Sequence, residues 1–224
     1  MDFYKFLKDL NIKIERNNRN ILDGKEIDFL LPDYNIGIEF NGCLWHSTFS
    51  NKDKKYHYNK RILAQNKNID LYTVWEDDWN YKQNIIKSII KSKLNIFDYI
   101  INSNNCKCIP ISHNEVNNFL EINDIQGPCT TYYNYGLYYK NELVSVIIFK
   151  KSKVKETFEI IRYCNKLNYN IINSLYTFIK YFINNCPDNI ENITYYINAD
   201  LNNGNTCYQT GMQLQNTKID YLWL

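Results

Sequence analysis

The sequence predicts an α/β protein with two parts: a mixed sheet flanked by helices, followed by an α+β domain. Residues 2–94 show the periodicities of a helix, three strands, a helix, a strand and a helix in that order, which favours a mixed sheet. A polar stretch at 102–105 is the best candidate linker, so we expect domains at 1–100 and 101–224. The hydrophobic content of 45%, with seven Gly and four Pro, provides for a core and argues against disorder.

The first part opens with a helix at residues 2–10, where large apolar side chains recur at helical spacing. Alternation predicts a short strand at 12–15, and the run of Asn and Arg at 17–20 predicts a turn. Further along, residues 71–75 form a strand and residues 80–94 a strongly periodic helix.

Residues 26–41 predict an antiparallel hairpin around the turn Pro32-Asp33-Tyr34-Asn35. Centring the turn between its two middle residues fixes the register, because a slip by one residue would mix the two faces. The register pairs Ile27 with Phe40, Phe29 with Ile38 and Leu31 with Ile36 on one face, and Glu26 with Asn41, Asp28 with Glu39 and Leu30 with Gly37 on the other.

The two carboxylates of Asp28 and Glu39 are the chemical consequence of this register. Directly opposed side chains have Cβ atoms roughly 5 Å apart. Like charges at that distance repel unless a proton or a cation lies between them, and Mg²⁺ is bound by one or two protein carboxylates. The alternative is a solvated acidic face on an edge hairpin.

A basic segment follows the hairpin. Six Lys or Arg and one Asp occur from Lys52 to Lys67, including Lys55, Lys60 and Arg61, which is typical of phosphate contacts or of a solvated helix face. Residues 56–66 predict a helix. We expect its stripe of His57, Lys60, Arg61 and Ala64 to be cationic and the side with Tyr58, Ile62 and Leu63 to pack.

The second part alternates strands and helices. Its predicted elements are a helix at 113–121 opened by a Ser112–Glu115 capping box, a hairpin of strands 132–139 and 142–150 around Lys140-Asn141, a strand at 158–163, a buried helix at 171–183, a strand at 194–198 and a short helix at 202–211 ending at Gly211.

Composition limits the class of protein. The net charge of +2 does not by itself indicate nucleic acid, and no run approaches the length of a membrane span. Seven cysteines without a disulfide framework, after a charged N-terminus, favour reduced thiols in an intracellular protein that is not secreted.

Four blocks of the first part resemble the phage-encoded homing endonucleases of the PD-(D/E)XK superfamily, whose relatives include the very-short-patch (Vsr-like) repair nucleases. The blocks are Glu26-Ile27-Asp28, Ile38-Glu39-Phe40-Asn41-Gly42-Cys43-Leu44-Trp45-His46-Ser47, Tyr56-His57-Tyr58-Asn59-Lys60, and Tyr72-Thr73-Val74-Trp75-Glu76-Asp77-Asp78-Trp79. The resemblance implies a restriction-endonuclease-like fold, double-stranded DNA as the partner and phosphodiester hydrolysis with Mg²⁺ or Mn²⁺.

The resemblance also assigns roles to single residues. Asp28 and Glu39 would bind the metal, and Asn41 stands where most of the superfamily has a catalytic lysine. His46 would act as general base or acid, and His57 would assist from the helix.

Contacts with DNA follow from the same motifs. Trp45 would be an apolar wedge between bases, Lys55, Lys60 and Arg61 would contact the backbone, and Glu26 would support the acidic face. The structural zinc of the repair enzymes is not expected, because Ser47-Thr48-Phe49-Ser50 replaces their His-rich, Cys-containing stretch.

The second part resembles the acetyltransferase-like (GNAT) domain that follows this nuclease in phage proteins. The matching blocks are residues 138–149, 160–168 and 202–211. Residues 168–174, at the position of the Gly-rich cofactor loop, contain no glycine, which argues against acetyl-CoA.

We therefore expect a Mg²⁺-dependent endodeoxyribonuclease, of homing type, in the host cell of a phage or virus. Two alternatives are an acyltransferase acting through the second part and a DNA-binding protein whose nuclease centre is dead because Asn41 replaces lysine.

Overall fold

The computed structural model describes residues 2–42 and 56–217 and confirms a mixed α/β architecture. The chain forms two compact units. The first consists of Met1–Ile86, Asn198–Asn203 and Gln213–Leu224, and the second of Lys87–Ile197 and Gly204–Met212. Along the chain, the first change of unit lies between residues 86 and 87, and later segments return to the first unit, whereas the sequence predicts one boundary between residues 100 and 101.

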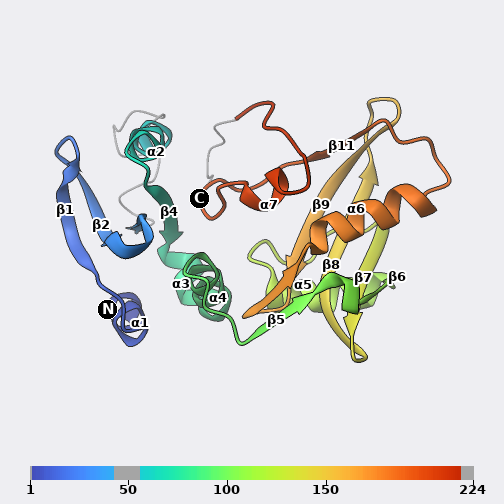
Figure 1. Ribbon diagram of the computed structural model, residues 1–224, viewed down its shortest axis with the longest axis horizontal. Helices are drawn as coiled ribbons and strands as arrows, with labels where there is room; N and C mark the ends of the chain where they lie inside the picture. Colours follow the sequence, from blue (N-terminus) through green and yellow to red (C-terminus); the bar gives the residue numbers. More distant parts are fainter. Residues whose placement is uncertain (1, 43–55, 218–224) are drawn as a thin grey trace. The chain divides into compact units, whose positions relative to one another are not determined.

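The first unit contains a four-stranded sheet in the order β1-β2-β3-β4 (Figure 1). The strands β1, β2 and β3 are antiparallel neighbours, and β4 runs parallel to β3. The elements are α1 (Asp2–Asp9), β1 (Glu15–Leu22), β2 (Lys25–Leu31), the 3₁₀ turn η1 (Pro32–Tyr34), β3 (Ile36–Asn41), α2 (Tyr56–Asn66), β4 (Asp70–Trp75), α3 (Glu76–Tyr81) and α4 (Gln83–Lys93), which crosses the division.

The predicted turn at 17–20 was wrong, because β1 runs through it. The pairing of β1 with β2 is irregular between Asn18 and Leu22, and Asn17 has a positive φ of 52°. The chain turns instead at Asp23 and Gly24, whose φ values of 51° and 86° suit a tight hairpin. Asn tolerates the left-handed region, so an Asn-rich run can bend a strand without ending it.

Helix α1 packs on the apolar face that the hairpin register predicted. The ring of Phe3 lies 5.4 Å from that of Phe29 on β2 and 5.1 Å from that of Phe40 on β3. It also meets Trp79 edge-on at 4.9 Å. The opposite face of the hairpin, which carries Asp28 and Glu39, is therefore turned away from this aromatic cluster.

The single helix predicted for 80–94 is two helices, because α3 ends at Tyr81 and Lys82 leaves the helical conformation. The acidic residues Glu76, Asp77 and Asp78 form the first turn of α3, where negative charge is favourable.

The second unit contains a five-stranded sheet in the order β11-β9-β8-β7-β6, and β5 pairs with β10 in a parallel ribbon. In the larger sheet β11 is parallel to β9 and the other neighbours are antiparallel. The elements are β5 (Tyr99–Asn102), η3 (Ser103–Asn105), β6 (Lys107–Pro110), α5 (His113–Asn123), β7 (Tyr133–Tyr139), β8 (Glu142–Lys151), β9 (Thr157–Asn165), β10 (Tyr169–Ile172), α6 (Ser174–Asn185), β11 (Asn192–Tyr195) and α7 (Asn205–Tyr208).

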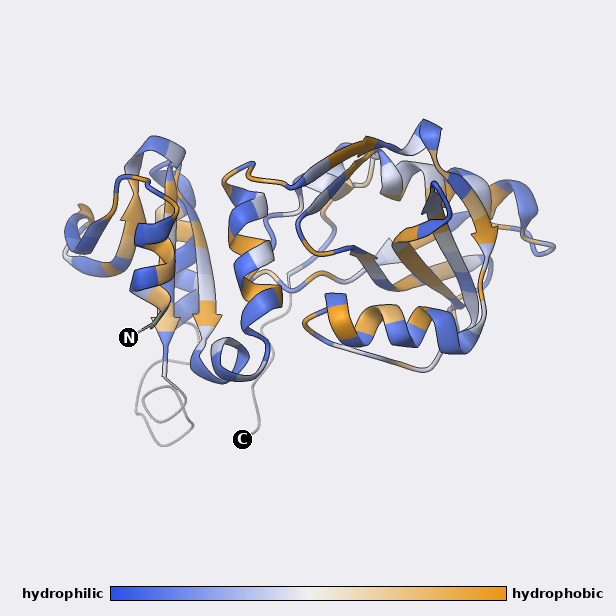
Figure 2. Cartoon of the chain, turned by 90° about the horizontal axis from the view of Figure 1, so that it is seen from below, coloured by the Kyte–Doolittle hydropathy of each residue, from blue (hydrophilic) through white to orange (hydrophobic). Residues whose placement is uncertain are grey.

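Both faces of the larger sheet are covered by helices, as alternation along β8 requires. Val146 and Ile148 belong to the cluster of α5, whereas Ile147 and Phe149 belong to the cluster of α6. Figure 2 shows hydrophobic residues on the strands and an alternation of hydrophobic and hydrophilic residues along the helices.

Two local predictions for this unit are confirmed. Ser112 and Glu115 form the capping box of α5. The hairpin turn at Lys140 and Asn141 has φ values of 47° and 67°. In the described residues no helix has the length and apolar character needed to cross a membrane.

Candidate metal centre

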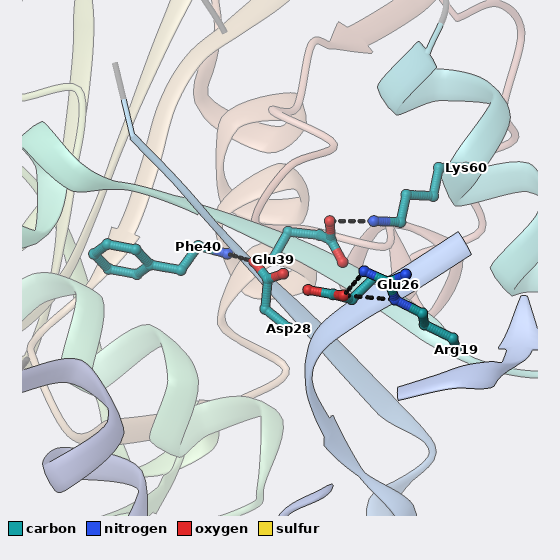
Figure 3. A network of polar contacts seen from close by, with 6 residues as sticks. All are labelled: Arg19, Glu26, Asp28, Glu39, Phe40 and Lys60. Carbon is teal, nitrogen blue, oxygen red and sulfur yellow. Dashed lines mark hydrogen bonds and ion pairs between the residues drawn. The ribbon is translucent and has the colours of Figure 1, made fainter. Parts of the chain in front are cut away.

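The hairpin of β2 and β3 positions the two acidic side chains. Three of the six predicted pairs are confirmed, namely Phe29–Ile38, Leu30–Gly37 and Leu31–Ile36. Ile27, which was predicted to face Phe40, instead belongs to the hydrophobic cluster of Leu30, Ala64 and Leu71. Phe29–Ile38 is the last pair toward the open end of the hairpin, so Asp28 and Glu39, which were predicted to pair, follow immediately beyond the ladder. There the N–H of Phe40 donates a hydrogen bond to the Asp28 carboxylate at 2.8 Å. Figure 3 shows the carboxylates of Asp28 and Glu39 beside each other.

The Asp28 carboxylate is thus fixed by the backbone of the neighbouring strand. Its Oδ2 atom accepts the Phe40 hydrogen bond, and the side chain is half-buried. A carboxylate held by a backbone donor keeps its orientation without a positive partner.

Glu39 is buried, with 5% of its surface exposed. Its Oε2 atom forms an ion pair with the ammonium of Lys60 from helix α2. Its Oε1 atom has no hydrogen-bond partner among the described residues. Burial raises the pKa of Glu39, and the charge and hydrogen bond of Lys60 oppose this shift. The charge of Asp28 adds to it, and a weaker contribution from the Asp28 backbone opposes it.

Lys60 is itself buried, with 3% of its surface exposed, and its ammonium lies 5.9 Å from the centre of the Tyr56 ring. We expected the stripe of His57, Lys60, Arg61 and Ala64 on α2 to form a cationic face, and this prediction was wrong for part of the stripe. Lys60 and Ala64 point inward, while Ile62 is 38% exposed. The carboxylate of Glu39 in the sheet draws the lysine inward, and periodicity along α2 alone does not contain that information.

Asn41 lies on β3, two residues after Glu39, and therefore on the same side of the sheet. It is 4% exposed, and its Nδ2 atom has no hydrogen-bond partner in the described part of the chain. On the neighbouring strand it pairs with Trp75.

Arg61, the next residue of α2, is held by Asp200. Its guanidinium lies 2.5 Å from the Asp200 carboxylate, which also accepts a hydrogen bond from Trp75 Nε1 at 3.2 Å. The segment of Asp200 runs beside β4, where the N–H of Thr73 donates to the carbonyl of Asp200 at 2.8 Å. Sequence analysis missed Asp200, since it lies far along the chain from the motifs that resemble a nuclease.

The remaining predicted residues that the structure describes have partners outside the Asp28–Glu39 pair, although Glu26 lies near these two carboxylates (Figure 3). His57 contacts the rings of Tyr56 and Trp75, at centroid distances of 5.4 and 6.0 Å. Glu26 on β2 forms an ion pair with Arg19 at 2.6 Å. Trp45, His46 and Lys55 lie outside the residues that the structure describes.

The donor set of Asp28 and Glu39 fits a divalent cation that prefers oxygen. Mg²⁺ commonly takes one or two protein carboxylates and completes its shell with water and phosphate. The Oε1 atom of buried Glu39, which has no partner within residues 2–42 and 56–217, is an oxygen that a cation could use. No group of three or more His, Cys, Asp and Glu side chains in the described residues has metal-binding geometry, so within them the centre has two carboxylates.

The second unit has a pocket of about 250 Å³ beside the start of α6. Its walls come from β9, β10, α6 and α7. The hydroxyls of Tyr163 and Ser174 lie 2.6 Å apart, and Asn173 takes a left-handed φ of 61° directly before the helix.

Comparisons of the chain with protein-family models, with curated proteins and with solved structures found no match.

Proposed function

We propose that the chain is a metal-dependent DNA endonuclease whose metal centre is formed by Asp28 and Glu39. The observation that carries the proposal is the buried carboxylate of Glu39, one oxygen of which has no hydrogen-bond partner among the described residues, beside the fixed carboxylate of Asp28. Two oxygen donors that repel each other in a mostly dry site favour a bound cation. The resemblance of the four sequence blocks to restriction-endonuclease-like homing enzymes supports double-stranded DNA as the substrate.

Each residue at the proposed metal centre would have its own role. A divalent ion at this centre supplies charge neutralisation at the phosphate and a hydroxide at neutral pH. Asp28 offers one oxygen in an orientation set by the Phe40 N–H. Glu39 offers the second from β3, and its position is maintained by Lys60. His57 is close enough to Trp75 to be oriented by its ring.

The second unit would have a subsidiary role in the proposed nuclease. The proposal of a GNAT-like unit is supported by the order β7-β8-β9 with a parallel β11, and by helix α6, which lies between β9 and β11 in the sequence. We propose that this unit serves DNA contact or target selection rather than acyl transfer.

The test is incubation of supercoiled and long linear DNA with the full chain and Mg²⁺, with and without a chelator. We expect cleavage that the chelator abolishes and that Asp28→Asn and Glu39→Gln each abolish. Asp33→Asn is the matched control, because Asp33 is an exposed carboxylate in the turn of the same hairpin. Chelator-resistant cleavage, or equal cleavage by all the variants, would refute the assignment. DNA binding without cleavage would favour the dead nuclease instead.

A further inference from the structure

The ion pair of Lys60 and Glu39 differs from the other ion pairs of the described residues by its burial. Its side chains are 4% and 7% exposed, whereas those of Arg19 and Glu26 are 69% and 32% exposed. Lysine is rarely buried to this extent. The desolvation of two charges costs about as much as their attraction returns, so a buried pair is poor evidence for a purely stabilising role.

The pair is also incomplete as a structural network. Glu39 Oε1 has no hydrogen-bond partner among the described residues, although its Oε2 meets Lys60. Fully satisfied partners are the rule for buried charges that serve stability. In addition, the negative charge of Asp28 acts on Glu39, so the Glu39 carboxylate has one cation and one further anion near it.

We propose that Lys60 is a positioning residue that acts as the internal cation of this centre and exchanges with the divalent metal. This inference rests on the proposed function. Without metal, the ammonium holds Glu39 in place beside Asp28. When metal binds, the contact between Lys60 and Glu39 breaks and a contact between Glu39 and the metal forms. The released ammonium then needs another anion, and the phosphate of bound DNA supplies one.

The exchange predicts a result that would not be expected if Lys60 had only a structural role. Removing the lysine removes a competitor of the metal and leaves two carboxylates unbalanced, so Lys60→Met should bind Mg²⁺ more tightly while being less stable without it. We expect the Mg²⁺ concentration at half-maximal thermal stabilisation to fall roughly tenfold, within the usual range of coupling between two sites. Lys60→Arg keeps the charge and should remain near the wild-type value.

The experiment is a thermal melting titration of the full chain with MgCl₂, for wild type, Lys60→Met, Lys60→Arg, Asp28→Asn and the control Lys67→Met. Lys67 follows α2 and is exposed, with its ammonium 3.6 Å from Asp23. If Mg²⁺ stabilises wild type but not Asp28→Asn, and Lys60→Met has the wild-type midpoint, the metal centre holds and the exchange is overturned. If Mg²⁺ stabilises none of the proteins, the proposed function fails with it.

A second measurement needs no variant and therefore applies even if Lys60→Met does not fold. Reductive methylation of wild type with formaldehyde and cyanoborohydride as the hydride donor, followed by peptide mass spectrometry, reports how accessible each lysine is. We expect Lys60 to be protected without metal and to react several-fold faster in saturating Mg²⁺, while Lys67 reacts equally in both. Unchanged protection of Lys60 in saturating Mg²⁺ would overturn the exchange.

Discussion

The carboxylate of Asp200 accepts from both the guanidinium of Arg61 and the indole N–H of Trp75, so a residue from the far end of the chain joins α2 to β4. The pair is largely buried, with side chains 16% and 26% exposed. Asp200 thereby holds the guanidinium of Arg61, which was predicted from the sequence to contact the DNA backbone.

Replacing Asp200 by Ala should destabilise the first unit. The variant leaves Arg61 and the Trp75 N–H without this acceptor, and hydrogen bonds to a charged group contribute about 2 kcal/mol. We expect Asp200→Ala to lower the free energy of unfolding by about that amount in urea denaturation. Asp33→Ala, at an exposed carboxylate, is the control. Equal midpoints for the two variants would contradict the role of Asp200.

Removing one partner of the buried pair of Lys60 and Glu39 should lower the free energy of unfolding more than removing both charges. Lys60→Met leaves the Glu39 carboxylate buried without its cation, which costs about 3 kcal/mol, whereas Lys60→Met combined with Glu39→Leu leaves no buried charge. Urea denaturation without metal should therefore rank the double variant as more stable than the single one. Lys13→Met is the control, since the pair of Lys13 and Glu15 is exposed and contributes about 0.5 kcal/mol or less.

The capping box of α5 should make stability depend on pH. Hydrogen bonds from the backbone and side chain of Ser112 lower the pKa of Glu115, with a smaller contribution from Tyr138. A lowered carboxyl pKa stabilises the folded state above the ordinary pKa, and this contribution is lost as the pH falls through the lowered value. Glu115→Gln should thus melt earlier than wild type at neutral pH and equally at a pH below the lowered pKa. A constant difference across that range would exclude the linkage.

The second unit should depend on Phe182 of α6. Its ring is fully buried and stacks on that of Phe149 at 4.0 Å, and it meets Phe158 edge-on at 5.0 Å. Phe182→Ala should lower the free energy of unfolding by about 4 kcal/mol. Tyr176→Ala, at a residue of the same helix that is 51% exposed, should have a small effect in the same denaturation experiment.

Acetyl-CoA should leave the melting temperature unchanged. The pocket of about 250 Å³ at the start of α6 is smaller than the 300–1,000 Å³ typical of ligand sites. The loop before α6 carries side chains where a pyrophosphate would need bare backbone N–H groups. A rise in melting temperature that saturates with acetyl-CoA would revive the acyltransferase alternative. The addition of Mg²⁺ alone serves as the comparison, since Mg²⁺ is expected to raise the melting temperature.

Local chemistry made part of this architecture predictable. Alternation around Pro32–Asn35 fixed the register of the hairpin, and therefore the neighbourhood of Asp28 and Glu39, because one face had to be apolar. The capping box at Ser112 and the turn at Lys140-Asn141 are similarly determined by side chains next to them in sequence.

Other features depend on contacts that sequence spacing does not encode. The inward orientation of Lys60 follows from a carboxylate on another element, since its helix has apolar residues on both sides. The docking of Asp200 joins positions 139 residues apart. The bend at Asn17 occurs within a strand, because pairing with β2 outweighs the turn preference of its side chains.

The membership of Asn198–Asn203 in the first unit has a consequence for biosynthesis. A ribosome makes the strands β1 to β4 early, whereas Asp200 is made only after residues 87–197 of the second unit. Until Asp200 has been synthesised, the first unit therefore lacks this contact between α2 and β4, and the Arg61 guanidinium lacks this acceptor.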